Sequence, residues 1–153
     1  MDIKYTNGYD PDFIYLCEEL DAYLNRLAGG EANRKIYVPL NARDGIHDVY
    51  VVYDEEIPIA CGGFKHHCPG IAEVKRVFVT EAYRNKGIGG QVMRLLEAKA
   101  KAKGYDKFIV ETGRDMPGAV RLYQNLNYQI IPNYGPYEGL ANSICMEKEL
   151  KSY

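Results

Sequence analysis

The chain of 153 residues carries 19 Lys and Arg against 21 Asp and Glu, with 46% hydrophobic residues. This length and ordinary globular composition predict a single domain over residues 1–153 with a buried core. The formal net charge of −2 argues against a nucleic-acid binder, and no apolar run approaches the ~18 residues of a membrane-spanning helix. Because the N-terminal string "MDIKYTNGYD" is unlike a secretory signal, we expect a cytoplasmic protein that binds neither nucleic acid nor a membrane.

The first predicted helix spans residues 11–27, where apolar side chains recur at intervals of three and four. Asp10 is placed to cap this helix, with Pro11 at its first position. The pair Gly29-Gly30 would end it. The stretch 31–45 is ambiguous and is expected to be a loop with at most a short helix.

Three strands are expected next, at 47–53, 57–67 and 72–79, because β-branched and aromatic residues dominate there. The turn strings "DEE" at 54–56 and "CPG" at 68–70 predict two hairpins. The remaining elements follow in the order helix, strand, helix, strand, strand: 88–103, 107–111, 117–126, 128–131 and 143–150. This order predicts a mixed sheet with helices packed on its faces.

Glycines open the predicted helix at 88–103, although glycine is the poorest helix former after proline. The string "YRNKGIGG" places Gly87, Gly89 and Gly90 where the first helical N–H groups lack partners inside the helix. A loop without β-carbons lets a phosphate reach those N–H groups, and Arg84 and Lys86 add positive charge. The alternative is a flexible turn with solvated cations.

A dinucleotide-binding loop is the first phosphate site to consider, because "GIGGQV" begins Gly-x-Gly and Glu111 follows at a suitable distance. However, Val92 occupies the position of the third glycine. Residues 80–86 also separate the first glycine from the preceding strand, which the dinucleotide fold does not allow. We therefore reject a nicotinamide oxidoreductase, and no Walker A string is present.

The string "VFVTEAYRNKGIGGQVM" resembles the GNAT superfamily of acyl-coenzyme-A-dependent N-acyltransferases, in its small-molecule branch. Arg84, Gly87 and Gly89 match the signature [RQ]-x-x-G-x-[GA]. The string "ETG…PGAVRLYQNLNYQIIP" is similar to the family's downstream helix and strand, and "YGPY…SICMEKEL" to its closing strands. The resemblance implies a single-domain α/β (α+β) fold whose mixed, mostly antiparallel sheet is splayed at the cofactor site, with helices on both faces.

The resemblance also implies acetyl-CoA (coenzyme A) as cosubstrate, lying where two neighbouring strands splay apart. The strand ending at Val79 would pair its backbone with the pantetheine amides, and the loop 84–90 would hold the pyrophosphate. The cofactor-binding residues expected on this basis are Val77, Phe78, Val79, Arg84, Asn85, Lys86, Gly87, Ile88, Gly89 and Gly90.

By the same resemblance, Tyr123 stands at the position of a frequent catalytic tyrosine and would give a proton to the departing thiolate. A strand N–H near Val77 or Val79 would stabilise the developing oxyanion. Glu73 is expected to accept the amine's proton, and its alternative role is an ion pair with Lys75 on the same strand face. Glu111 is a second candidate for the base.

The acceptor pocket is expected to involve the regions 13–46 and 132–142, with Tyr134 and Tyr137 as substrate-facing walls. One departure concerns the start of the helix containing Tyr123. Many family members carry an amide side chain there, whereas this chain has Met116 and Pro117. A pantetheine contact through an amide side chain is therefore in doubt.

No metal is expected. In the string "HHC" at 66–68, His66 and His67 point to opposite faces of a strand, so at most two ligands could converge. A zinc site usually takes four. The four cysteines form no Cys-x-x-Cys pair, which favours reduced thiols.

The sequence thus predicts an acetyl-CoA-dependent N-acetyltransferase that transfers an acetyl group directly to a primary amine of a small molecule in a ternary complex. The alternative is a non-catalytic acyl-CoA sensor with the same fold. A monomer or a homodimer is expected, and the identity of the amine stays open.

Overall fold

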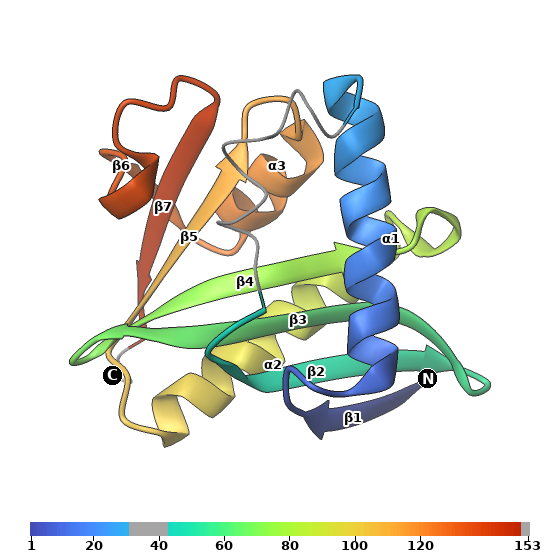
Figure 1. Ribbon diagram of the computed structural model, residues 1–153. Helices are drawn as coiled ribbons and strands as arrows, with labels where there is room; N and C mark the ends of the chain where they lie inside the picture. The colour runs from blue at the N-terminus through green and yellow to red at the C-terminus, as the bar shows by residue number, and fades with distance from the viewer. Residues whose placement is uncertain (31–42, 151–153) are drawn as a thin grey trace.

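The computed structural model describes residues 1–30 and 43–150, drawn in Figure 1. In chain order its helices and strands are β1 (Asp2–Thr6), α1 (Pro11–Ala28), β2 (Ile46–Asp54), β3 (Ile57–Cys68), β4 (Ile71–Val79), α2 (Ile88–Ala102), β5 (Lys107–Gly113), α3 (Pro117–Asn125), β6 (Gln129–Ile131) and β7 (Ser143–Glu149). Two 3₁₀ turns, η3 (Glu81–Tyr83) and η4 (Gly135–Tyr137), complete the list. The short helix considered within 31–45 falls mainly outside the described residues.

One seven-stranded sheet runs through the molecule in the order β1-β2-β3-β4-β5-β7-β6. All neighbouring strands pair antiparallel except β4 and β5, which are parallel. That parallel pair extends only from Ile71–Glu73 on β4 to Lys107–Ile109 on β5. Beyond it the two strands diverge, as Figure 1 shows. The mixed, mostly antiparallel, splayed sheet expected from the sequence is confirmed.

Helices cover both faces of the sheet, which is also as expected. α1 crosses one face over β2, β3 and β4, and α2 lies behind the sheet (Figure 1). Phe13 and Leu16 of α1 pack with Val49 and Val51 in one apolar cluster. A second cluster joins α2 and α3 to the other face. Full burial of a Leu or Phe side chain contributes about 1.5–3 kcal/mol, so these two clusters hold the layers together.

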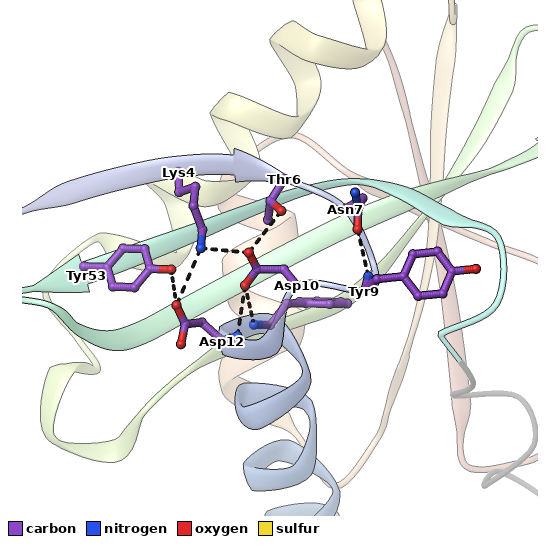
Figure 2. A network of polar contacts seen from close by, with 8 residues as sticks. Lys4, Thr6, Asn7, Tyr9, Asp10, Asp12 and Tyr53 are labelled. Atoms are coloured by element: carbon purple, nitrogen blue, oxygen red, sulfur yellow. Dashed lines mark hydrogen bonds and ion pairs between the residues drawn. The ribbon is translucent and has the colours of Figure 1, made fainter.

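The N-terminus of α1 is fixed by a polar network around Asp10 (Figure 2). The Asp10 carboxylate accepts hydrogen bonds from the backbone N–H groups of Asp12 at 2.9 Å and Phe13 at 3.2 Å. Lys4 of β1 lies 2.7 Å from the same carboxylate, and Thr6 donates to it at 3.1 Å. The predicted cap is confirmed, and it also joins β1 to α1.

The predicted hairpin turns are present. Glu55 and Glu56 both adopt positive φ, at 48° and 74°, which is the conformation of a tight two-residue hairpin. Gly70 turns between β3 and β4 with φ 82°. β5 continues to Gly113, past its predicted end. Within residues 1–30 and 43–150, no helix has the length and apolarity needed to cross a membrane.

Candidate active site

A cavity of about 180 Å³ opens where β4 and β5 diverge. The two strands, α1, α3 and the connection between β6 and β7 all contribute to its walls. Its polar lining includes four of the residues that the sequence singled out for chemistry, Glu73, Glu111, Tyr123 and Tyr137, together with Lys75, the ion-pair partner considered for Glu73.

A β-bulge in β4 accompanies this divergence. Along the pairing of β3 with β4, Cys61 opposes Phe78 but Gly63 opposes Lys75, so two residues of β4 face Gly62. Arg76 takes the left-handed conformation there, with φ 60°. A bulge bends its strand and increases its twist, so it favours separation of β4 from β5 beyond Glu73.

The charged residues of the cavity gather on the sheet face that α1 covers. Val74 and Val110 belong to the apolar cluster beneath α2 and α3. Because side chains alternate along a strand, their neighbours Glu73, Lys75 and Glu111 point to the opposite face. Tyr123 comes from α3, so the phenol and the carboxylates approach the gap between the strands from different sides.

Glu73 is buried, with 6% of its surface exposed, and both of its carboxylate oxygens are engaged. Tyr134 donates its hydroxyl hydrogen to Oε2 across 2.8 Å, and Lys75 Nζ lies 3.6 Å from Oε1. Lys75 also donates to the hydroxyl of Tyr137 at 2.9 Å. Burial lowers the pKa of Lys75, while the charge of Glu73 opposes this effect. The ion pair considered as the alternative role of Glu73 is therefore present.

Glu111 is the less restrained of the two carboxylates. Ser143 of β7 donates to its Oε2 across 2.8 Å. Burial raises the pKa of Glu111 above its ordinary value of 4.5, against the opposing effects of the Ser143 hydrogen bond and the Lys75 charge. Sequence reasoning missed Ser143, because only the register between β5 and β7 brings it to this carboxylate.

Tyr123 lies on α3 with 5% of its surface exposed, and its ring packs edge-to-face against Tyr128 at 5.7 Å between centroids. Within the described part of the chain, its hydroxyl has no hydrogen-bond partner. Burial, with a further effect of the charge on Glu111, raises its pKa above the ordinary 10.0. The phenol therefore keeps its proton at neutral pH and can act as a hydrogen-bond donor.

The glycine loop forms the N-terminus of α2. Gly87 is the N-cap residue in the left-handed conformation, φ 79°, and no side chain caps the helix. A β-carbon added at Gly87 would meet no atom within 4 Å, so this position faces open space. The first turn of α2 carries no acidic side chain. Its N–H groups are thus accessible to an anion.

The Arg84 side chain contacts other protein groups, unlike a side chain that is free to bind a phosphate. Its Nε donates to the carbonyl of Val79 at 2.9 Å, and its guanidinium lies 4.6 Å from the ring centroid of Tyr23. Arg84 therefore ties the loop to the end of β4 and to α1. Lys86 lies 5.5 Å from the ring centroid of Tyr83.

The other residues discussed from the sequence lie at the edges of the cavity or outside it. Met116 lines the cavity at the start of α3, where an amide is common in the family. His66 is hydrogen bonded to Tyr105 at 3.0 Å, and His67 packs against Tyr134. Among residues 1–30 and 43–150, no three His, Cys, Asp or Glu side chains gather as metal ligands could.

The structure brings Glu73, Glu111, Tyr123 and Tyr137 to one cavity, and Tyr134 contacts it through Glu73. The loop 84–90 follows the end of β4 and η3 and lies outside the cavity lining.

Comparison with known proteins identifies the family. The chain matches the family model Acetyltransferase (GNAT) family over residues 11–128. It is 30% identical over 138 residues to the IAA acetyltransferase of Azospirillum brasilense, covering 90% of each chain. A Klebsiella pneumoniae protein assigned to the acyl-CoA N-acyltransferases shares the fold, with TM-score 0.81, 24% identity and coverage of 98% and 97%. A GNAT family acetyltransferase from Elizabethkingia anophelis, solved with acetyl-CoA bound, matches with TM-score 0.58, 25% identity and coverage of 67% and 75%. The chain therefore belongs to the GNAT acetyltransferase family.

Proposed function

We propose that this protein is an acetyl-CoA-dependent N-acetyltransferase that moves an acetyl group to the primary amine of a small molecule by direct transfer in a ternary complex. The observation that carries the proposal is the cavity between β4 and β5, where the buried Glu73 and the half-buried Glu111 face the gap from one side and the Tyr123 phenol from the other.

The residues present fit acetyl-CoA, which supplies the acetyl group as a thioester. Beyond Glu73 the edge of β4 that faces β5 has no strand partner among the described residues, so backbone groups near Val77 and the Val79 N–H are available to amides of the pantetheine arm, while the Val79 carbonyl already accepts a hydrogen bond from Arg84. Gly87 begins α2 without a capping side chain, and the N–H groups at this helix N-terminus suit a pyrophosphate, whereas the Arg84 N–H already donates to the Glu81 carbonyl at 3.3 Å.

We propose that Glu111 accepts the proton of the attacking amine. Its raised pKa brings a carboxylate closer to the working pH of a general base. The sequence favoured Glu73 as the base, but its carboxylate is already engaged by Tyr134 and Lys75. In this proposal Glu73 instead fixes the positions of the Tyr134 and Lys75 side chains beside Glu111.

Tyr123 is proposed to stabilise the departing thiolate of coenzyme A as a hydrogen-bond donor. A thiol has an ordinary pKa of about 8.5, which is below the raised pKa of this phenol, so the phenol donates a hydrogen bond to the sulfur as negative charge develops there and need not lose its proton. A backbone N–H at the β4 bulge, near Val77, would stabilise the charge on the acetyl oxygen. The acceptor amine would approach from the face of α1, where Leu20 and Leu24 line the cavity.

A small-molecule acceptor is proposed for two reasons. The cavity is small, about 180 Å³, and is walled by α1 and by the β6–β7 connection, with Tyr137 only 2% exposed. The similarity over 90% of both chains to an IAA acetyltransferase also supports an acceptor other than a protein side chain.

The test is release of free thiol from acetyl-CoA in the presence of a panel of primary amines. We expect release that requires both protein and amine and that saturates with amine concentration. A folded protein that binds coenzyme A but releases no thiol with any amine would instead support the non-catalytic sensor.

A further inference from the structure

Arg76, the residue at the β4 bulge, is held in a conformation that few non-glycine residues adopt. Its φ of 60° lies in the left-handed region, and its surface is 9% exposed. Glycine would occupy this position without strain. Strained residues persist where the surrounding structure over-determines them, and they cluster at functional sites.

Three sets of contacts restrain Arg76. Its Nη1 and Nη2 donate to the two carboxylate oxygens of Asp21 on α1, at 2.8 and 2.9 Å. The Cys61 thiol of β3 donates to the Arg76 carbonyl at 3.3 Å. On either side of the bulge, Lys75 and Phe78 stay paired with β3. Side chain, carbonyl and neighbouring backbone are therefore all fixed.

The pair with Asp21 is the contact that balances the charge of this buried cation. The side chain of Arg76 is 6% exposed and that of Asp21 is 42% exposed. The Nε atom of Arg76 is buried and has no hydrogen-bond partner among the described residues. If Asp21 lost its charge, the buried guanidinium would lose its counterion, and Arg76 would have to move or draw in water.

Asp21 also lies on the helix that lines the acceptor side of the cavity. Leu20 precedes it and Leu24 is one turn further on, and both line the cavity. The ion pair therefore connects α1 to β4 at the place where β4 leaves β5. The next backbone N–H along β4 is that of Val77, which the proposed function assigns to the acetyl oxygen.

We propose that Asp21 and Arg76 are positioning residues: their ion pair fixes the β4 bulge so that the Val77 N–H points into the cavity between β4 and β5. This inference rests on the proposed function. Neither side chain touches the reacting atoms. The pair acts through the backbone. Its loss should therefore lower kcat, which reports on the transition state, rather than the affinity for coenzyme A.

The test compares Asp21→Asn, Asp21→Glu and Arg76→Gly with the parent protein. The control is Glu147→Gln, which breaks the 3.2 Å pair with Lys107 at the closed, paired end of β5. For Asp21→Asn we expect kcat to fall roughly tenfold or more, because small misplacements of a catalytic group are costly. The Kd for coenzyme A, set largely by the loop 84–90, should stay within about twofold.

Asp21→Glu keeps the charge and should recover part of kcat. Arg76→Gly suits the left-handed backbone and so should fold, yet it loses the pair and should also lower kcat. Glu147→Gln should leave kcat unchanged. The proposal is overturned if Asp21→Asn has the kcat of Glu147→Gln, or if kcat and coenzyme A affinity fall together in every Asp21 variant.

A second readout keeps this inference separate from the proposed function. If the parent transfers no acetyl group, the proposed function fails. The NMR signal of the Val77 amide then tests separately whether the ion pair fixes the bulge. Asp21→Asn should shift that signal and speed its hydrogen exchange, while Glu147→Gln should not. An unchanged Val77 amide in Asp21→Asn would show that the ion pair does not position it.

Discussion

Ser143 donates a hydrogen bond to Glu111 across 2.8 Å, from β7 to the neighbouring strand β5. This contact fixes Oε2 of the carboxylate. The other oxygen, Oε1, accepts no hydrogen bond from any residue in the described ranges. Glu111 is thus oriented by one partner and keeps one oxygen for a proton, as a general base requires.

Replacing Glu111 by Gln should remove activity without lowering stability at neutral pH. Burial raises the folded-state pKa of Glu111 above 4.5, so folding favours the protonated form. That contribution is fully present below the unfolded-state pKa and is lost as the pH rises through the folded-state pKa. At pH 7 the parent carries the cost of a desolvated charge, which Gln avoids. We expect kcat to fall roughly 10²–10⁴-fold.

Denaturant unfolding at several pH values measures the stability part of this prediction. The free energy of unfolding of Glu111→Gln should equal or exceed that of the parent at pH 7, with a difference that shrinks in acid. Glu149→Gln, at an exposed carboxylate on the same sheet, is the control and should change neither kcat nor the free energy of unfolding. Full activity in Glu111→Gln would assign the base elsewhere.

Tyr123→Phe should abolish most turnover and leave the fold intact. The hydroxyl has no hydrogen-bond partner in the described part of the chain, so its removal should change the free energy of unfolding by less than about 1 kcal/mol. Loss of the hydrogen-bond donor should lower kcat roughly 10²–10⁴-fold. Steady-state thiol release and thermal unfolding measure the two effects.

The matched control for Tyr123 is the neighbouring ring, Tyr128. Its hydroxyl donates to Glu97 at 2.7 Å, so Tyr128→Phe should cost about 1 kcal/mol of stability while activity persists. The opposite pattern, with an active Tyr123→Phe and an inactive Tyr128→Phe, would remove Tyr123 from the mechanism.

Gly87→Ala should weaken coenzyme A binding. Gly87 has φ 79°, and an alanine there is strained by about 1 kcal/mol and would disturb the N–H groups of the helix N-terminus. Gly104, just beyond the other end of α2, has φ 92° and equally open space around it. Both alanine variants should lose similar stability, but only Gly87→Ala should raise the calorimetric Kd for coenzyme A. Equal Kd values for the two would place the phosphate site elsewhere.

Asp10→Ala should lower stability but not activity. The variant loses two hydrogen bonds to the first turn of α1 and the ion pair with Lys4 shown in Figure 2. Loss of an N-cap costs roughly 0.5–2 kcal/mol. Chemical denaturation measures the cost, and kcat at a temperature where the variant is folded should match the parent. A large drop in kcat under that condition would show that the start of α1 shapes the cleft.

Local chemistry made much of this fold predictable. The cap formed by Asp10 before Pro11 and the "DEE" turn are decided by neighbouring residues, so the sequence alone indicates them. Tyr123 could not be chosen by periodicity, because a tyrosine on an apolar helix face is ordinarily a core residue. The resemblance to a family singled it out.

Long-range register explains what the sequence did not reveal. The bulge at Arg76 exists because Gly63 pairs with Lys75 while Cys61 pairs with Phe78, and no local pattern reports that shift. The partners Asp21 and Arg76 are far apart in the chain. The same holds for Lys75 and Tyr137, which meet only because the β6–β7 connection returns to β4.

The central claim is that the gap between β4 and β5 is the place where an acetyl group passes to an amine. The most direct measurement is mass spectrometry of the amine panel after incubation with acetyl-CoA that carries an isotopically labelled acetyl group. The account predicts labelled acetyl on the nitrogen of at least one small primary amine, formed by the parent and strongly reduced with Tyr123→Phe and Glu111→Gln. Label that reaches no amine, while calorimetry shows that the folded protein binds acetyl-CoA, would contradict it.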